Sequence, residues 1–241
     1  MKVALVTGAN QGIGFETARI LIRRGYFVYL GCRNPESGIR AIETLGREGL
    51  KNANWVRLDV TDQKSVDEAV VQVTDPALDV LINNAGILGA RAVPGETYAL
   101  DELRRVFETN LFGVIRVTQA FLPHLVRSEA PRIVNVTSGL GSLTLQSDPT
   151  WRFSRYKHPA YVPSKAALNA HTVVLSAELA PKGFKVNAVD PGYTATAFNG
   201  YTGDRSPEVS AAFVVKAATL GPDGPTGRFL SEERPGGELP W

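Results

Sequence analysis

Tyr161 and Lys165 stand four positions apart in the segment Tyr-Val-Pro-Ser-Lys, and their side chains could perform acid–base chemistry together. The apolar spacing around them predicts a helix over 160–180, and residues i and i+4 share one face of a helix. A tyrosine hydroxyl has an ordinary pKa of about 10, and a nearby ammonium favours the phenolate, so we expect Lys165 to lower the pKa of Tyr161. Such a phenol could give a proton to a forming alkoxide and take it back in reverse. Taken singly, either residue could be an ordinary solvated side chain.

A glycine-rich segment near the start of the chain is typical of a phosphate-binding turn. Gly8, Gly12 and Gly14 follow the apolar run 3–6 and lead into helical periodicity over 13–24. Glycine permits a tight turn and a close approach to a diphosphate, and the free N–H groups of a helix N-terminus attract that anion. Glycines also form ordinary turns, so the prediction depends on the strand before and the helix after. The expected cofactor contacts here are Gly8, Asn10, Gln11, Gly12, Ile13 and Gly14.

The end of the second apolar run bears on which dinucleotide is bound. Folds that bind NAD place an acidic residue about twenty positions after the glycine turn, on the ribose hydroxyl. Here residues 31–34 read Gly-Cys-Arg-Asn and contain no acid. Arg33 could pair with a 2′-phosphate, a group that a carboxylate would repel; the alternative is a solvated surface arginine. We therefore expect NADP(H) as the cofactor, with Arg33 on its phosphate.

These residues need a scaffold, and short apolar runs alternate with helical periodicity along the chain. The apolar runs lie at 3–6, 27–30, 55–58, 80–82, 133–136, 186–189 and 228–230, and helical spacing occurs at 13–24, 66–73, 100–126 and 160–180. Compact apolar runs suit strands buried on both faces of a parallel sheet, and the alternation implies right-handed crossovers. The sequence therefore predicts an α/β fold, a doubly wound parallel sheet (Rossmann fold) of about seven strands with helices on both faces.

Nothing in the 241 residues reads as a linker, a repeat or a low-complexity run, so we expect one dinucleotide-binding domain over 1–241. Two long connections, 86–97 and 140–159, follow the fourth and fifth runs. Ligands of open α/β sheets bind beyond the carboxyl ends of the strands, so both loops should border the site, with 140–159 as a substrate loop. The Gly- and Pro-rich tail, about 222–241, is expected to close the fold and then fray.

Composition argues against several other classes of protein. The formal net charge of +2 gives no reason to expect nucleic acid or an anionic membrane as a partner. The first apolar run is too short for a signal peptide, and no segment approaches the ~20 apolar residues that cross a bilayer. The single cysteine, Cys32, favours a reducing compartment, and we expect a cytoplasmic location. His124, His158 and His171 are too scattered to predict a metal site.

Further motifs, taken in order, resemble those of the short-chain dehydrogenase/reductase family over nearly the whole chain. The glycine spacing Thr-Gly-x-x-x-Gly-x-Gly at 7–14 is similar to that family rather than to the general dinucleotide fingerprint. The resemblance implies cofactor contacts from Asp59 and Val60 at the adenine, from Asn83, Asn84, Ala85 and Gly86 along the cofactor, and from Pro191, Gly192, Thr194 and Thr196 at the nicotinamide. The ordered set resembles a carbonyl-reductase-like member.

The same resemblance implies four catalytic residues: Asn110, Ser138, Tyr161 and Lys165. Ser138 would hydrogen-bond the substrate carbonyl and stabilise developing negative charge. Lys165 would also bind the nicotinamide ribose, and Asn110 would position a water in a proton relay. Taken singly, Ser138 could merely end a strand and Asn110 could cap a helix.

The function that this pattern favours is reversible, NADPH-dependent reduction of a ketone or aldehyde to an alcohol. The hydride would come from the nicotinamide and the proton from Tyr161. One alternative is reduction of a 3-oxoacyl thioester on a carrier protein, which would favour a basic docking patch that the sequence does not clearly show. Another is a regulator that binds NADPH without turnover, against which Tyr161 and Lys165 argue.

The segment before Tyr161 is longer than is usual in simple members of the family, since Ser138 and Tyr161 are 23 positions apart. Related carbonyl reductases with long insertions here are often monomeric, so monomer and homo-oligomer both stay open. Residues 146–158 contain much of the extra length and should help to wall the pocket. The candidate pocket residues are Leu88, Leu140, Trp151, Tyr193 and Phe198. They favour a small apolar or aromatic carbonyl or alcohol substrate, although aromatic residues more often belong to a core.

Overall fold

Seven parallel strands form one sheet in the computed structural model, which describes residues 1–90, 95–234 and 236–241. The strands are β1 (Val3–Thr7), β2 (Phe27–Cys32), β3 (Ala53–Arg57), β4 (Val80–Asn83), β5 (Arg132–Val136), β6 (Lys185–Asp190) and β7 (Phe229–Ser231). Their order is β3-β2-β1-β4-β5-β6-β7, and every neighbouring pair is parallel. The predicted doubly wound sheet of about seven strands is confirmed, and its order reverses between β1 and β4.

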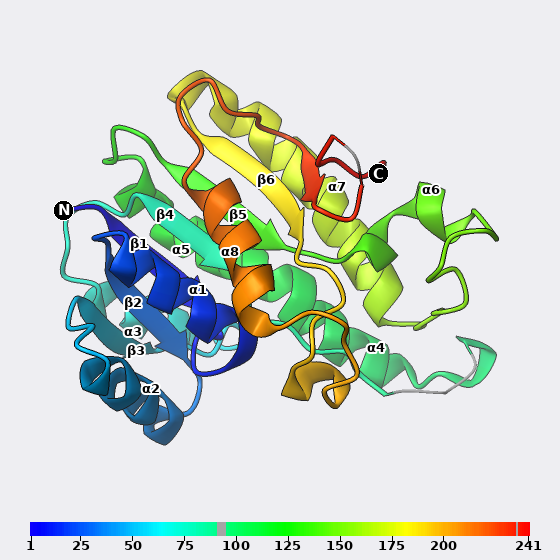
Figure 1. Ribbon diagram of the computed structural model, residues 1–241, viewed down its shortest axis with the longest axis horizontal. Helices are drawn as coiled ribbons and strands as arrows, with labels where there is room; N and C mark the ends of the chain where they lie inside the picture. Colours follow the sequence, from blue (N-terminus) through cyan, green and yellow to red (C-terminus); the bar gives the residue numbers. More distant parts are fainter. Residues whose placement is uncertain (91–94, 235) are drawn as a thin grey trace.

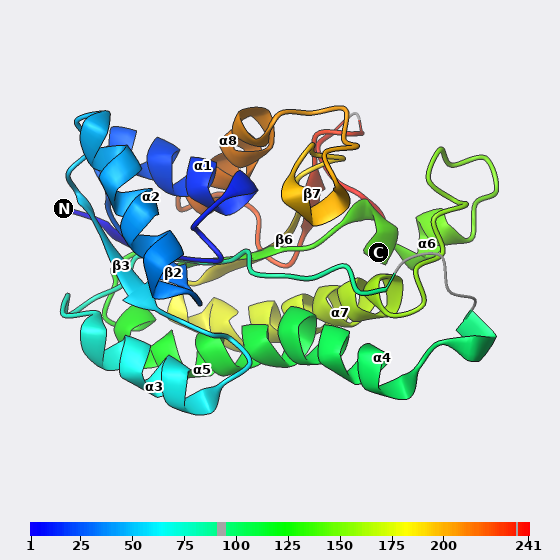
Figure 2. The same ribbon diagram turned by 90° about the horizontal axis from the view of Figure 1, so that it is seen from below.

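Helices cover both faces of this sheet (Figures 1 and 2). One face carries α1 (Gly12–Arg23), α2 (Pro35–Arg47) and α8 (Pro207–Ala218), and the other carries α3 (Gln63–Gln72), α4 (Leu100–Phe107), α5 (Gly113–Leu125) and α7 (Tyr161–Leu179). β1 shows why its apolar run is unbroken. Ala4 and Val6 pack into the core beneath α1 and α8, whereas Val3 and Leu5 pack into the core on the opposite face. A strand that is buried on both faces has no solvent-facing positions, so polar residues do not alternate with apolar ones in its sequence.

The predicted helix over 100–126 is interrupted. A π-helical turn, Glu108–Phe112, separates α4 from α5, and it contains Asn110. Such turns insert one extra residue into a helix and are frequent at functional sites. The turn therefore changes the direction of the Asn110 side chain relative to the two flanking helices.

The connection from β5 to α7 and the C-terminal tail pack against each other. The connection contains the short helices Gly139–Gly141 and α6 (Leu143–Gln146). The Trp241 ring stacks on Phe229 with centroids 5.4 Å apart, and the Trp241 carbonyl accepts hydrogen bonds from the backbone and hydroxyl of Thr144. The expectation that the tail frays is therefore wrong at its end. Of the other predicted loop, 86–97, residues 91–94 lie outside the described residues.

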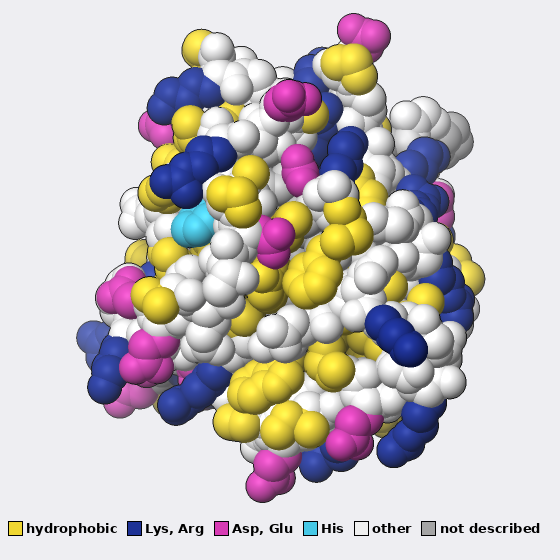
Figure 3. Space-filling view, turned by 90° about the vertical axis from the view of Figure 1, so that its left-hand side faces the viewer, with side chains coloured by type: hydrophobic (Ala, Val, Ile, Leu, Met, Phe, Trp, Pro, Cys, Tyr) yellow, Lys and Arg dark blue, Asp and Glu magenta, His cyan; other side chains and the backbone are white. Residues whose placement is uncertain are grey.

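No helix in the described part of the chain is both long enough and apolar enough to span a membrane. On the face shown in Figure 3, acidic and basic side chains are interspersed, and neither sign gathers into one large patch.

Candidate active site

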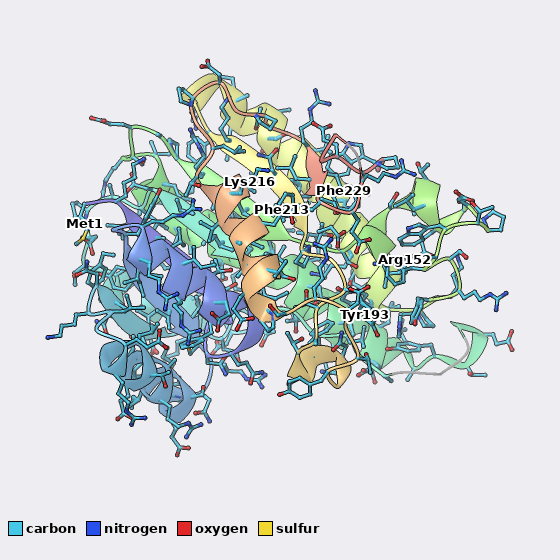
Figure 4. The ribbon with its side chains drawn as sticks, in the orientation of Figure 1. Met1, Arg152, Tyr193, Phe213, Lys216 and Phe229 are labelled. Carbon is cyan, nitrogen blue, oxygen red and sulfur yellow. The ribbon has the colours of Figure 1, made fainter. Side chains whose placement is uncertain are left out.

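A cavity of about 1260 Å³ opens beyond the carboxyl ends of β1, β4, β5 and β6. It runs from Arg33, past the glycine turn, to Tyr161 and the aromatic residues of the substrate loop. Figure 4 shows two residues at this end, Tyr193 and Arg152, on the opposite side of the molecule from Met1. Every predicted site residue lines the cavity except Asn83 and Asn110. The structure thus gathers side chains that are far apart in the sequence at the switch point of the sheet.

The β1–α1 turn has the backbone that a diphosphate requires. Gly8 and Gly12 have positive φ angles of 64° and 57°, which favour glycine. A Cβ on Gly14 would lie 2.4 Å from Nδ2 of Asn84 and 2.5 Å from the Gly8 carbonyl, so no side chain fits there. Gln11 precedes α1 and does not cap it with its side chain. The N–H groups of the first helical turn therefore remain available to an anion at the helix N-terminus.

A second segment, 83–86, fixes this turn from the side. The Thr7 hydroxyl accepts hydrogen bonds from the backbone N–H groups of Asn84 (2.9 Å) and Ala85 (3.0 Å), and Asn84 Nδ2 donates to the Thr7 carbonyl at 2.9 Å. Asn83 instead points into the protein, where its amide donates to Thr118 and Asn135. The Asn83 side chain therefore supports the sheet from behind, and the expected cofactor contact from Asn83 stays a prediction.

The opposite end of the cavity is open and polar. Arg33 is exposed and lines the cavity together with Asn34 and Ser37. No ion pair to Arg33 is found within the part of the chain that the structure describes, so its guanidinium is available to an anion. Asp59 and Val60 line the same end, and the Asp59 carboxylate accepts hydrogen bonds from the backbone and hydroxyl of Thr61.

Tyr161 is the first residue of α7, is 7% exposed and lines the cavity. Ser138, which follows β5, lines the same cavity. Burial raises the pKa of Tyr161 well above its ordinary value; the nearby Ser138 hydroxyl lowers that pKa in part, and the charge of Asp190 raises it further. The net shift is upward, so the expectation of a lowered pKa for Tyr161 is not met by this arrangement of side chains.

The position of Lys165 explains that difference. Its Nζ donates to the Val136 carbonyl at 2.8 Å and lies 5.7 Å from the centre of the Tyr161 ring. Only 4% of the residue is exposed, and burial lowers its pKa to about 8. The ammonium is therefore directed at the end of β5, along the cavity wall, and not at the phenol oxygen.

Asn110 lies behind the cavity wall and is fully buried. Its Oδ1 accepts from the backbone N–H of Ile87 at 2.8 Å, and its Nδ2 donates to the Ile87 carbonyl at 2.9 Å and to Ser164 at 3.0 Å. A Cβ on Gly86 would lie 3.4 Å from Oδ1 of Asn110 and 3.7 Å from Nζ of Lys165. The Asn110 amide thus fixes the segment that follows β4, beside Lys165. The role of Asn110 in a water relay stays a prediction.

Aromatic side chains form a continuous wall on the substrate side, here called the aromatic wall. Neighbouring ring centres lie 5.5–6.5 Å apart, mostly edge to face. Its members are Trp151, Phe153, Tyr156, His158, Tyr161, Tyr193 and Phe198. The five candidate pocket residues all line the cavity. Tyr156 and two acids, Asp190 and Glu233, also line it but were missed, because their neighbours along the sequence carry no recognisable motif.

The fold is a Rossmann fold in which Ser138, Tyr161 and Lys165 line one cavity at the switch point of the sheet. The sequence pattern of the short chain dehydrogenase family matches residues 2–206, and the protein belongs to that family. The predicted family is therefore confirmed. In the described residues, no group of three or more His, Cys, Asp or Glu side chains is arranged to hold a metal ion.

Individual relatives cover almost the whole chain. A short-chain dehydrogenase of Penicillium roqueforti, anuI, is 36% identical over 247 residues, covering 99% of this chain and 97% of the relative. Salutaridine reductase of Papaver bracteatum is 32% identical over 295 residues, covering 95% and 94%. Among solved structures, an NADPH-bound carbonyl reductase from chicken fatty liver matches with a TM-score of 0.85 and 30% identity over 100% of both chains.

Proposed function

We propose that the protein reduces a ketone or aldehyde to an alcohol with NADPH, reversibly, and that Tyr161 supplies the proton. The observation that carries this proposal is that Tyr161 and Ser138 line the same cavity as the glycine turn. The similarity to salutaridine reductase and to a carbonyl reductase supports a carbonyl substrate. We also propose that residues 1–241 act as one domain.

The cavity fits a dinucleotide. The glycine turn leaves no room for side chains where a diphosphate would approach, and the α1 N-terminus offers N–H groups to it. Arg33 would hold a 2′-phosphate, which supports NADP(H) over NAD(H), as does the NADPH in the similar carbonyl reductase. When bound, this cofactor supplies the hydride.

The chain's own residues supply the proton and the geometry. Ser138 and Tyr161 both face the cavity, so a carbonyl oxygen placed between them would accept two hydrogen bonds. Because burial keeps Tyr161 protonated at neutral pH, the phenol enters the reaction as the proton donor. The buried wall of the cavity excludes water and strengthens both hydrogen bonds to the developing alkoxide.

The aromatic wall supports an apolar or aromatic substrate. Rings spaced 5.5–6.5 Å apart present faces and edges on which a flat apolar molecule packs well. Because Tyr161 is itself part of the wall, a substrate held there would have its carbonyl close to the proton donor. The substrate is therefore proposed to carry its carbonyl next to an apolar or aromatic ring system.

A panel of carbonyl compounds tests this function. Aliphatic, cyclic and aryl ketones and aldehydes are incubated with the protein, and the absorbance of NADPH is followed, with NADH in parallel. We expect turnover with NADPH, faster for aryl and polycyclic ketones than for small aliphatic ones. Tight NADPH binding without oxidation of NADPH by any compound would contradict the proposed reaction.

A further inference from the structure

Residues 237–241, here called the returning segment, run back from β7 to the substrate loop. The Ser231 N–H donates to the Gly237 carbonyl at 2.9 Å, and the Leu239 N–H donates to the Phe229 carbonyl at 2.8 Å. These hydrogen bonds hold the segment antiparallel to β7, which is the edge strand of the sheet. Figures 1 and 2 both place the C-terminus beside α6. The returning segment therefore connects the sheet to the substrate loop.

The polar contacts between the returning segment and the loop lie at the N-terminal cap of α6. The Ser142 hydroxyl accepts a hydrogen bond from the Leu145 N–H at 3.1 Å and donates one to the Pro240 carbonyl at 2.7 Å. Close by, the Thr144 hydroxyl donates to the Trp241 carbonyl at 2.8 Å. A capping hydroxyl that both accepts and donates is held in one orientation. The returning segment therefore fixes the start of α6.

An apolar contact between the returning segment and the loop lies directly behind the cavity. Leu239 belongs to a small apolar core, and the Trp151 ring packs against that core. The other members of this core are Leu145, Ala188 and Phe229. A Cβ on Gly139 would lie 3.5 Å from Cζ2 of Trp151 and 3.6 Å from Cδ1 of Leu239. Trp151 lines the cavity, whereas Leu239, which is 8% exposed, is not among the described residues that line it. Leu239 therefore supports the Trp151 ring from behind.

The position of Trp151 depends on this packing. Its N–H donates to the Asp148 carbonyl at 3.2 Å and its carbonyl accepts from the Ser154 N–H at 2.9 Å, so both hydrogen bonds stay within the loop. The ring also packs edge to face on Phe153, which belongs to the same loop. Packing against the core of Leu239 is what joins the ring to the sheet. Because dispersion contacts weaken steeply with distance, a space in place of Leu239 would leave the ring free to move.

We propose that Leu239 is a positioning residue that holds Trp151 in place and thereby determines how closely the pocket encloses an aryl substrate. A ring that is already fixed loses no further freedom when a substrate packs on it, which favours binding. Loss of this support therefore weakens the binding of aryl ketones and leaves proton transfer from Tyr161 unchanged. The inference rests on the proposed function, because it concerns the substrate pocket of that reaction.

Kinetics with an aryl ketone that the wild type reduces test this role. In Leu239→Ala we expect KM to rise by about fivefold or more, with kcat within about twofold of wild type and the Kd for NADPH unchanged. Leu239→Met refills the space and should bring KM back to within about twofold of wild type. Leu179→Ala makes the same change at a buried leucine at the opposite end of α7 from Tyr161, and should leave KM unchanged. A wild-type KM in Leu239→Ala would overturn the proposal.

The support of the loop can be measured without any substrate. Trypsin cleaves after Arg152, Arg155 and Lys157, which are exposed residues of the loop. Cleavage requires local opening, so its rate reports how firmly the loop is held. With sites mapped by mass spectrometry, we expect cleavage in the loop of Leu239→Ala to be about fivefold faster than in the wild type. Leu239→Met and Leu179→Ala should be cleaved there at the wild-type rate. An unchanged rate in Leu239→Ala would show that Leu239 does not hold the loop.

The two proposals can fail separately. If the wild-type protein reduces no carbonyl compound, the cleavage rates still decide whether Leu239 holds the loop. If the protein is an active reductase and Leu239→Ala has the wild-type KM, the reductase stands and the role of Leu239 is rejected. If Leu239→Ala does not fold, Leu239→Val, whose side chain is shorter by a methylene, is measured against the same criteria.

Discussion

Lys165 is a cation held inside the protein at a cost in stability. Burial lowers its pKa from 10.5 to about 8, so between these two values the unfolded chain binds more protons than the folded one. Stability should therefore rise with pH across that interval, and the penalty should be complete below about pH 8. We expect Lys165→Met to raise the free energy of unfolding at pH 7 by roughly 1–3 kcal/mol and to abolish turnover. Denaturant unfolding of the wild type and of Lys165→Met from pH 7 to pH 10 checks this prediction. The difference between their free energies of unfolding should become smaller as the pH rises. A variant less stable than the wild type at pH 7 would contradict the predicted cost of burying Lys165.

Arg33 is the residue on which cofactor choice is predicted to depend. Its guanidinium is exposed at the polar end of the cavity, where a 2′-phosphate would lie. Arg33→Asp should weaken NADPH binding at least tenfold, because a carboxylate repels the phosphate, and should change NADH binding little. Fluorescence titration with each nucleotide measures the two Kd values. An unchanged preference would remove Arg33 from the phosphate site, and Arg47→Asp, at the exposed C-terminal end of α2, is the matched control.

The residues of the site were easier to predict than their surroundings. The four-residue spacing indicated Tyr161 and Lys165, and the family resemblance indicated Ser138; all three line one cavity in the structure. The direction of the pKa shift on Tyr161 could not be read in this way. It depends on how deeply the hydroxyl is buried and on Asp190, which is 29 positions away in the sequence and adjacent only in the fold.

At the scale of elements, the β1–α1 turn requires glycine at position 14, because neighbouring atoms leave no room for a Cβ there. Gly14→Ala would place its Cβ 2.4 Å from Asn84 Nδ2, so the turn or segment 83–86 must move. We expect a loss of NADPH affinity of at least tenfold by calorimetry. Gly46→Ala is the control, since no heavy atom lies within 4 Å of the Cβ it would add to α2. That variant should keep wild-type NADPH affinity and gain up to about 1 kcal/mol of stability. Equal affinity in both variants would show that the turn does not approach the cofactor.

The strands were predictable because both faces of the sheet are covered, which leaves compact apolar runs in the sequence. Two helices, α2 and α8, were not among those the periodicity singled out. Both begin with a capping residue followed by proline, Asn34-Pro35 and Ser206-Pro207, a signal that could have found them. The π-helical turn at Asn110 leaves no comparable signal, because it depends on contacts with Ile87 and Ser164.

At the scale of the whole molecule, Arg152 joins the substrate loop to two other segments. Its guanidinium pairs with Asp204 at 3.3 Å and with Glu233 at 2.9 Å, and it packs over the Phe153 ring. Exposed ion pairs contribute little each, about 0–1 kcal/mol. Arg152→Gln should therefore raise KM for bulky aryl ketones a few-fold by loosening the aromatic wall, with Kd for NADPH unchanged. Arg104→Gln, which breaks an exposed pair on α4, should alter neither constant. A wild-type KM in Arg152→Gln would show that the contacts of Arg152 do not hold the aromatic wall in place.

Contacts at this scale were the least predictable from sequence. The sheet order follows from alternation and handedness, but the docking of Trp241 on Phe229 and Thr144 does not. Each of these contacts joins residues that are 12 or more positions apart in the chain. The hydrophobic periodicity of helices and strands does not predict such pairs. The tail therefore looked free to fray, although its last residue is held in place.

Replacing one oxygen atom tests the central claim most directly. Tyr161→Phe removes the phenol oxygen and keeps the ring that packs against His158 and Phe198. If Tyr161 is the proton donor, the variant should bind NADPH with nearly wild-type Kd, while kcat for carbonyl reduction falls by at least a hundredfold. Carbonyl reduction by Tyr161→Phe at a rate close to wild type would contradict the account.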